Sequence, residues 1–281
     1  MAPGTAGAMR RVRAPIRGGE EFPINHLLRT DKMRIVEGLE RYAVVSCHVE
    51  RPLDDRVWVA FERLLERRPG GFAVTALIRP PHAGSGEDAE LWLERARRAA
   101  ELGPLGHHTH WGGPTQARPV TPGDAAETVR EEADWLRAHA LEPRYFCGGG
   151  WYLDEPVAET LASLGYVDCS ATTFRQDYLA PGAARLQLPG PRRVRLPSGA
   201  ELLELPATHS VGMLGRGLLR LRGLVHVHFH DWELADRRRA AAIASLLRVL
   251  GLLRHPLSAD ELAHRGARAA EISWAEATIA P

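Results

Sequence analysis

Ala43-Val44-Val45-Ser46-Cys47-His48-Val49-Glu50 joins a short apolar run to a histidine and a carboxylate. Such a run is typical of a strand that is buried on both faces of a parallel sheet. The segment 54–66 follows with apolar residues at helical spacing, and Gly70-Gly71 stops it. The sequence therefore predicts a strand followed by a helix, with polar side chains at the carboxyl end of the strand.

The same alternation continues along the chain. Residues 72–78 form a second predicted strand, and 87–102 form a helix that ends before Gly103. Further predicted helices cover about 124–140, 154–164, 236–253 and a short segment from Ser258, and further predicted strands cover 166–168 and 224–230. Repeated units of this kind indicate an α/β fold with a mainly parallel sheet and outer helices, open or closed into a barrel.

Length and composition favour one large folded domain. The chain has 281 residues, of which 44% are hydrophobic and 25% charged, as expected for an α/β domain with a well-buried core. Residues 1–22 lack an apolar period and are predicted to form a flexible arm. We expect residues 23–281 to form a single domain.

Charge and cysteine content limit the expected partners and location. The formal net charge is +1, so no global field attracts nucleic acid or a membrane, although local patches remain possible. Small molecules are the expected partners, and the oligomeric state stays open. The three cysteines have no C-x-x-C spacing, and no signal-peptide core or membrane span is present in the sequence. We therefore expect a cytoplasmic protein.

Three short segments with histidines lie where predicted strands end. They are Cys47-His48-Val49-Glu50, His107-His108-Thr109-His110-Trp111 and His226-Val227-His228-Phe229-His230-Asp231. The carboxyl ends of parallel strands converge on one rim, so residues from these segments can meet around one ion. Imidazole and carboxylate are good ligands for zinc and similar divalent ions. The pattern favours a metal-dependent hydrolase.

Each segment also has a simpler interpretation. His48 can be a packed side chain, and Glu50 can begin a solvated loop. In an extended segment His108 and His110 share one side, whereas His107 points away. His226 lies deepest in its strand and is expected to be an interior histidine, while His230 at the strand end is better placed as a proton donor.

Other residues near the predicted rim have two interpretations as well. Gly148, Gly149 and Gly150 allow close backbone approach to a substrate, or they form an ordinary loop. Gln116 and Arg118 are candidates for holding polar substrate groups, or they are solvated loop residues. Three tryptophans adjoin the rim and are candidates for stacking on a sugar ring: Trp111, Trp151 and Trp232.

The order of these motifs resembles the polysaccharide deacetylase family, carbohydrate esterases that remove acetyl groups within a distorted β/α barrel. The resemblance covers the chain from about Tyr42 to His230. Segment 106–111 resembles the metal-binding histidine-threonine motif of the family, segment 145–152 with 164–170 resembles its third motif and the elements after it, and segment 227–234 resembles the motif of the acid histidine.

The resemblance implies that Glu50 and His108 bind a divalent metal, expected to be Zn²⁺, and that His230 is the general acid. Gly112 occupies the position of the family's second metal histidine, so His110 is the nearest substitute. His48 stands where the family has its aspartate base.

Cys147 stands where the family has the arginine that steadies this aspartate. A histidine base does not need a guanidinium partner, so the two replacements are chemically coherent. They also fit a loss of activity.

We therefore expect a metal-dependent amide hydrolase, with an N-deacetylase of an acetamido sugar or of a sugar-containing small molecule as the leading form. In this hypothesis His48 is the base, a backbone N–H of Gly148, Gly149 or Gly150 holds the oxyanion, and His230 protonates the departing nitrogen. Asp231 or another carboxylate orients His230. The alternatives are a hydrolase of another C–N bond on the same scaffold and a non-catalytic carbohydrate-binding or metal-binding relative.

Overall fold

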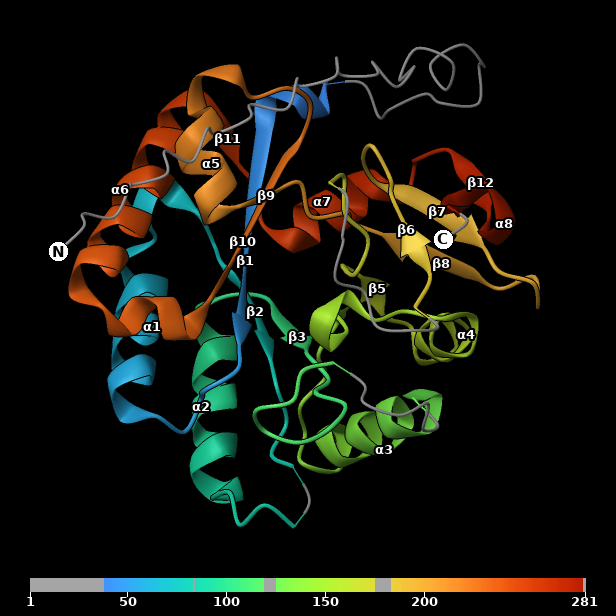
Figure 1. Ribbon diagram of the computed structural model, residues 1–281, viewed down its shortest axis with the longest axis horizontal. Coiled ribbons are helices and arrows are strands. Elements are labelled where there is room, and N and C mark those ends of the chain that lie inside the picture. The colour runs from blue at the N-terminus through green and yellow to red at the C-terminus, as the bar shows by residue number, and fades with distance from the viewer. Residues whose placement is uncertain (1–37, 83, 119–124, 175–182, 280–281) are drawn as a thin grey trace, which may run out of the picture. The chain divides into compact units, whose positions relative to one another are not determined.

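The computed structural model describes residues 38–82, 84–118, 125–174 and 183–279 (Figure 1). All of them belong to one compact unit, Arg34–Pro281. The predicted N-terminal arm, residues 1–22, lies outside the described residues. No helix among the described residues is long and apolar enough to cross a membrane.

Parallel strands form the centre of the molecule. Strand β1 (Tyr42–Val49) pairs with β2 (Thr75–Ile78) on one side and with β10 (Val225–His230) on the other. The sheet continues in parallel from β2 through β3 (Leu105–His107), β4 (Tyr145–Phe146) and β5 (Val167–Asp168). All these carboxyl ends therefore lie on the same edge.

One extended segment links the two sides of this sheet. It begins as β8 (Glu201–Glu204), parallel to β5, and ends as β9 (His209–Ser210), parallel to β10. Between them, the N–H of Ala207 donates to Ala171 O, and the N–H of Thr208 donates to His226 O. The strand ladder itself is not closed, but this segment spans both sides. The mainly parallel α/β architecture of a distorted barrel is confirmed.

Short strands extend the sheet beyond β8. Strand β7 (Arg192–Arg195) runs antiparallel to β8, and β12 (Glu271–Ser273) pairs with β7. The remaining pairs are β11 (His255–Pro256) on β1 and β6 (Arg185–Leu186) with β13 (Thr278–Ile279).

Most helices cover the outer face of the barrel, whereas the helix that carries Leu262 and Ala263 packs in the same buried cluster as Val44 of β1 (Figure 1). The helices are α1 (Asp55–Arg67), α2 (Ala89–Leu102), α3 (Ala125–Ala138), α4 (Glu155–Leu164), α5 (Val211–Gly217), α6 (Arg237–Leu253), α7 (Ala259–Gly266) and α8 (Trp274–Ala277). Asp54 and Asp154 accept backbone N–H groups at the starts of α1 and α4. Short 3-10 turns include η3 (Leu39–Arg41), η4 (Pro69–Gly71), η5 (Gly149–Trp151), η6 (Leu218–Arg220) and η7 (Asp231–Ala235).

Side chains of β1 alternate between two environments. Val45, Cys47 and Val49 pack in the apolar layer that also contains Phe61 of α1. Val44 belongs instead to the cluster inside the barrel. Because successive residues of a strand point to opposite faces, Ser46 and His48 share the inner side with Val44, and Glu50 follows at the rim.

Candidate metal centre

Three histidine rings surround the carboxylate of Glu50 at the rim of the barrel. Glu50 Oε1 lies 3.9 Å from His108 Nε2, 3.7 Å from His110 Nε2 and 3.6 Å from His230 Nε2. Glu50 follows β1, His108 and His110 follow β3, and His230 ends β10. The structure thus brings together all the residues that the sequence predicted as metal ligands, with His230 beside them.

Backbone contacts fix the tautomers of His108 and His110. His108 Nδ1 donates to Cys147 O at 2.7 Å, and His110 Nδ1 donates to Pro114 O at 3.1 Å. A carbonyl oxygen only accepts, so in the neutral ring the proton sits on Nδ1 and the lone pair on Nε2. The two Nε2 atoms are buried and have no hydrogen-bond partner among the described residues. Buried lone pairs that face a carboxylate are the arrangement that a divalent cation requires.

The spacing and ionisation of these groups suit a zinc-like ion. Ligand atoms each about 2.1 Å from a tetrahedral zinc lie about 3.4 Å apart, and the distances from Glu50 are only a few tenths of an ångström longer. Burial raises the pKa of Glu50, but the rings of His108 and His110 and the charge of His230 outweigh it, and the pKa falls well below its usual range. Burial lowers the pKa of His108. An ionised carboxylate therefore faces a neutral ring.

Trp232 holds the other oxygen of Glu50. Its indole Nε1 donates to Glu50 Oε2 at 3.1 Å, which leaves Oε1 toward the histidines. The Trp232 ring also stacks on His230, with the centroids 5.4 Å apart, and the Arg239 guanidinium lies over it. Trp232 lies at the rim as predicted, and it positions a candidate ligand in addition to any contact with a sugar.

Glu132 of α3 fixes the segment that carries His108 and His110. His107 Nε2 and Thr109 Oγ1 both donate to Glu132 Oε2, each at 2.7 Å. His107 and Thr109 thus face α3, and the residues that alternate with them face the rim. Sequence reasoning missed Glu132. The alternation that placed His108 and His110 on one side also implied buried polar groups on the other, so an acceptor was to be expected there.

His48 packs at the centre of the histidine cluster. Its ring centroid lies 4.7 Å from that of His108, 5.0 Å from that of His230 and 5.2 Å from that of Trp151. Burial, followed by the charges of neighbouring histidines, lowers the pKa of His48 well below its usual value. The ring is therefore neutral and able to accept a proton, with reduced basicity. His48, His108 and Cys147 also have possible ligand atoms within 4.8 Å of one another.

Glu233, rather than Asp231, lies beside the ring of His230. Glu233 Oε2 accepts the backbone N–H of His230 at 2.8 Å and lies 3.8 Å from Nδ1. Burial lowers the pKa of His230, but Glu233 and Glu50 outweigh it, and the pKa rises above its usual value. The protonated ring is favoured, as a proton donor requires.

Asp231 binds backbone amides. Its carboxylate accepts the N–H groups of Arg51 and Trp232, both at 2.8 Å, and burial raises its pKa to about 6. The residue therefore ties the loop after β1 to η7. The geometry does not support the expected orienting role of Asp231.

Two further histidines of β10 lie inside the barrel. As expected, His226 is an interior histidine, with Nε2 3.0 Å from Ser46 Oγ. His228 packs edge-on against Trp151, with the centroids 4.8 Å apart. Burial lowers the pKa of His226 to about 4 and that of His228 to about 3, so both rings are neutral.

The glycine triplet serves packing within the chain. The N–H of Gly148 donates to Ser170 Oγ at 3.0 Å, and the N–H of Gly149 donates to Thr109 O at 2.9 Å. These two amides are therefore engaged within the fold, and within the triplet the expected oxyanion contact stays a prediction for Gly150. A Cβ on Gly148 would lie 2.0 Å from Tyr152 O, so glycine is needed for the close approach of two backbone segments.

Gly150 and Trp151 form the turn at the end of this loop. Both have positive φ, +64° and +60°. This conformation is strained for a tryptophan and is typical of functional sites. Trp151 is buried, so it forms a wall of the site rather than an exposed platform for a sugar.

Gln116 and Arg118 lie on the loop that packs over the glycine triplet. Gln116 Nε2 donates to Arg118 O at 2.9 Å, and a Cβ on Gly150 would lie 2.4 Å from Arg118 Cγ. A Cβ on Gly112 would lie 2.4 Å from Gln116 Cγ. The space into which a histidine at position 112 would project is therefore filled, and it is His110 whose Nε2 faces Glu50.

A buried carboxyl pair lies beneath the glycine triplet. Ser170 Oγ, which accepts the N–H of Gly148, donates to Asp168 Oδ1 at 2.8 Å. Asp168 of β5 is the register partner of Glu204 of β8. Burial raises the pKa of both, that of Asp168 to about 6 and that of Glu204 well above its usual value. Burial therefore favours the protonated form of both carboxyls.

Comparisons with known proteins concern the fold. A 4-α-glucanotransferase from Thermococcus litoralis matches 80% of this chain with a TM-score of 0.50 and 13% identity, and the chain spans only 38% of that protein. A Bordetella bronchiseptica protein assigned to O-antigen biosynthesis as a polysaccharide deacetylase has a TM-score of 0.44 and 16% identity, with 82% of this chain and 91% of that chain covered.

A family 4 carbohydrate esterase from Streptomyces lividans, in complex with acetate, has a TM-score of 0.44 and 12% identity, with 79% of this chain and 95% of that chain covered. No protein-family model and no curated protein sequence matches the chain. The likeness is one of fold.

Proposed function

We propose that this protein is a metal-dependent amide hydrolase, with an N-acetyl group of a sugar or of a sugar-containing small molecule as its substrate. The observation that carries the proposal is the pair of buried, unpaired Nε2 atoms of His108 and His110 facing ionised Glu50. The motif resemblance to polysaccharide deacetylases supplies the reaction class, since its acid histidine maps to His230.

Glu50, His108 and His110 would hold the metal. A bound divalent ion such as zinc polarises a carbonyl and lowers the pKa of a water molecule. The supporting groups around this set are Trp232, Glu132 and two backbone carbonyls. Such outer contacts fix ligand rings and raise their affinity.

The remaining residues would move the protons. His48 is neutral because of its burial, so it takes a proton from the attacking water. His230, held by Glu233 and favoured in its protonated form, gives a proton to the nitrogen of the leaving amine. The C–N bond breaks, and acetate and a free amine are released. The same groups would hydrolyse another type of C–N bond if the substrate carries that bond in place of the N-acetyl group.

A non-catalytic metal-binding or carbohydrate-binding relative is the second candidate. Two observations favour it: the basicity of His48 is reduced by its packing, and the amides of Gly148 and Gly149 are engaged within the fold. In that case the metal set is retained without turnover.

The test is the release of acetate and amine from a panel of N-acetylated monosaccharides and oligosaccharides by the zinc-loaded protein. We expect turnover by the wild type and a loss of about 10²-fold or more in His48→Asn and His230→Gln. His264→Ala, which removes an exposed histidine of α7, is the control and should retain full activity. Stoichiometric metal without turnover on the whole panel would favour the non-catalytic candidate.

A further inference from the structure

Two leucines at one end of the barrel are almost fully exposed. Leu219 in η6 is 93% exposed, and Leu252 near the end of α6 is 85% exposed. Single exposed leucines are ordinary, but a contiguous group marks an interaction surface. Val249 and Leu253 are exposed beside Leu252. We call Leu219, Val249, Leu252 and Leu253 the leucine patch.

The two segments of the leucine patch are neighbours in space. Arg254 Nη2, just after α6, donates to Leu221 O at 2.9 Å. Helices α5 and α6 also pack together, since a Cβ on Gly215 would lie 3.7 Å from Leu246 Cδ1. Leu221 packs against the core while Leu219 points away from it. The patch therefore joins the end of α6 to η6.

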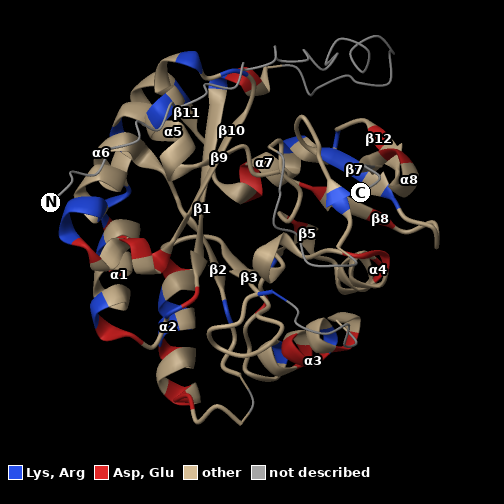
Figure 2. Ribbon diagram, in the orientation of Figure 1, with Lys and Arg blue, Asp and Glu red and all other residues tan. Residues whose placement is uncertain are grey.

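The two chain segments that form the leucine patch carry basic side chains and no acidic ones. The segments 205–230 and 237–259 contain no aspartate or glutamate. Arg216, Arg220, Arg222, Arg248 and Arg254 lie on these segments toward the patch, whereas Arg237, Arg238 and Arg239 begin α6 at its other end, next to η7 (Figure 2). Only Arg239 of these forms an ion pair with a described residue, Glu233. The net charge of the whole chain, +1, conceals this local excess.

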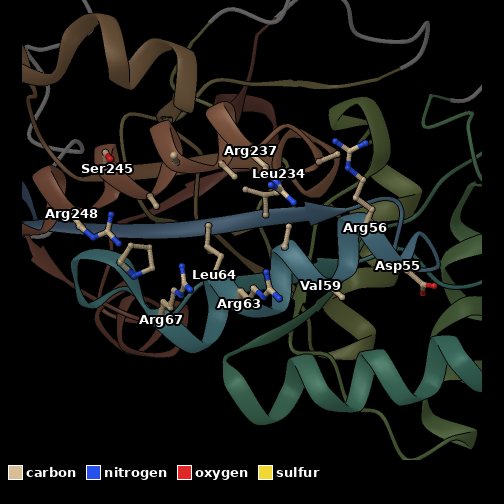
Figure 3. Close-up of a pocket in the computed structure, with 16 residues that line it drawn as sticks. Asp55, Arg56, Val59, Arg63, Leu64, Arg67, Leu234, Arg237, Ser245 and Arg248 are labelled. Carbon is tan, nitrogen blue, oxygen red and sulfur yellow. The ribbon is translucent and has the colours of Figure 1, made fainter.

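A groove between α1 and α6 extends the basic surface from Arg248, which precedes Val249 of the patch. The groove has a volume of about 780 Å³, and its arginines are Arg56, Arg63, Arg67, Arg237 and Arg248 (Figure 3). Arg67 and Arg248 lie at one end and Arg56 at the other. The acid in its lining, Asp55, is paired with Arg95. None of the groove arginines has an ion-pair partner among the described residues.

We propose that the leucine patch and its arginines bind the surface of an anionic lipid bilayer. Leucines enter the boundary between head groups and acyl chains, and arginines reach the phosphates. A second copy of the chain would place arginines against arginines across a two-fold contact. Nucleic acid would neutralise the arginines but would offer no apolar partner to Leu219 and Leu252.

The position of the leucine patch leaves the candidate metal centre accessible. The patch lies beside the segment that enters β10 and at the end of α6, whereas His230 ends β10 at the opposite end of the strand (Figure 1). A protein bound through the patch therefore directs its rim away from the bilayer. This is surface binding, and it requires no membrane-spanning helix.

The test is co-sedimentation of the full chain with two kinds of vesicle: phosphatidylcholine alone, and equal parts of phosphatidylcholine and phosphatidylglycerol. We expect at least about tenfold stronger binding to the anionic vesicles, with binding reduced by added salt. The double variant Leu219→Ser/Leu252→Ser should weaken it by about tenfold. Its melting temperature should not change, because both side chains are already exposed.

A matched pair of charge variants separates the patch from overall charge. Arg220→Gln/Arg222→Gln should weaken vesicle binding about tenfold. Arg193→Gln/Arg195→Gln, on β7 and outside the patch, removes the same charge and should leave binding unchanged. Equal or absent binding to both vesicles overturns the proposal. So does a dimer in solution that the leucine variant dissociates, or binding to duplex DNA that the leucine variant retains.

Discussion

Replacement of Glu132 tests whether α3 positions the candidate metal ligands. In Glu132→Ala, His107 Nε2 and Thr109 Oγ1 lose the acceptor that both contact at 2.7 Å. Thr109 Oγ1 and His107 Nε2 lie 3.1 Å apart and can still pair with each other, so one buried donor is left without a partner and the free energy of unfolding should fall by about 1–3 kcal/mol. Glu132→Gln keeps an acceptor oxygen of the same shape and should cost about 1 kcal/mol.

Loss of Glu132 should also disturb the candidate metal ligands, because His108 and His110 alternate along the chain with His107 and Thr109, which contact Glu132. We expect the zinc affinity of Glu132→Ala to fall by about 10–100-fold and that of Glu132→Gln to fall by much less. Urea denaturation of the metal-free protein measures the first effect, and titration of zinc against a competing chelator measures the second.

Glu131→Ala, an exposed neighbour on α3, is the control. It should change the free energy of unfolding by no more than about 0.5 kcal/mol. If Glu132→Ala unfolds like this control, or if it binds zinc as tightly as the wild type, the positioning role is refuted.

Three further substitutions probe the surroundings of the site. Trp232→Phe keeps an aromatic ring but removes the donor to Glu50 Oε2, so zinc affinity in the chelator titration should fall about tenfold; an unchanged affinity would contradict this. Gly148→Ala places a Cβ 2.0 Å from Tyr152 O and should lower the free energy of unfolding by more than about 1 kcal/mol in urea denaturation. Burial raises the pKa of Glu204 in the folded protein. Ionisation of this carboxyl therefore destabilises the fold once the pH rises above the pKa that Glu204 has in the unfolded chain. Glu204→Gln should therefore raise the melting temperature, more at about pH 8 than at about pH 4; a gain confined to acid pH would contradict the sign.

The main elements of the barrel were predictable because each leaves a long periodic pattern. Strand β1 and the helices α1 and α6 have apolar runs or helical spacing over many residues. Strands such as β6 and β9 have two residues each, which is too short for any period. Their pairing depends on the tertiary fold.

Alternation along an extended segment predicted which histidines share a side. It placed His108 and His110 together because the chain stays extended past β3. It could not identify Glu132, which lies on a helix in a run of carboxylates and is distinguished only by the element packed against it. The bond from Trp232 to Glu50 joins residues 182 positions apart, so no local pattern contains it.

Two expectations named several candidate residues, and the structure engages some of those residues elsewhere. Asp231 is next to His230 in sequence, but neighbouring residues at a strand end point in different directions, and its carboxylate turns to backbone amides. Gly148 and Gly149 do serve close backbone approach, as glycine predicts. However, they approach other segments of the same chain rather than a substrate, and the N–H groups of Gly148 and Gly149 donate to those segments.

The metal content of the purified protein shows whether Glu50, His108 and His110 form a metal site. Elemental analysis would compare the wild type with Glu50→Ala, His108→Ala, His110→Ala and the control His264→Ala. We expect near-stoichiometric zinc or a related divalent metal in the wild type and the control, and its loss in the other three variants. No metal in any preparation after reconstitution, or full retention in the three ligand variants, would contradict this expectation.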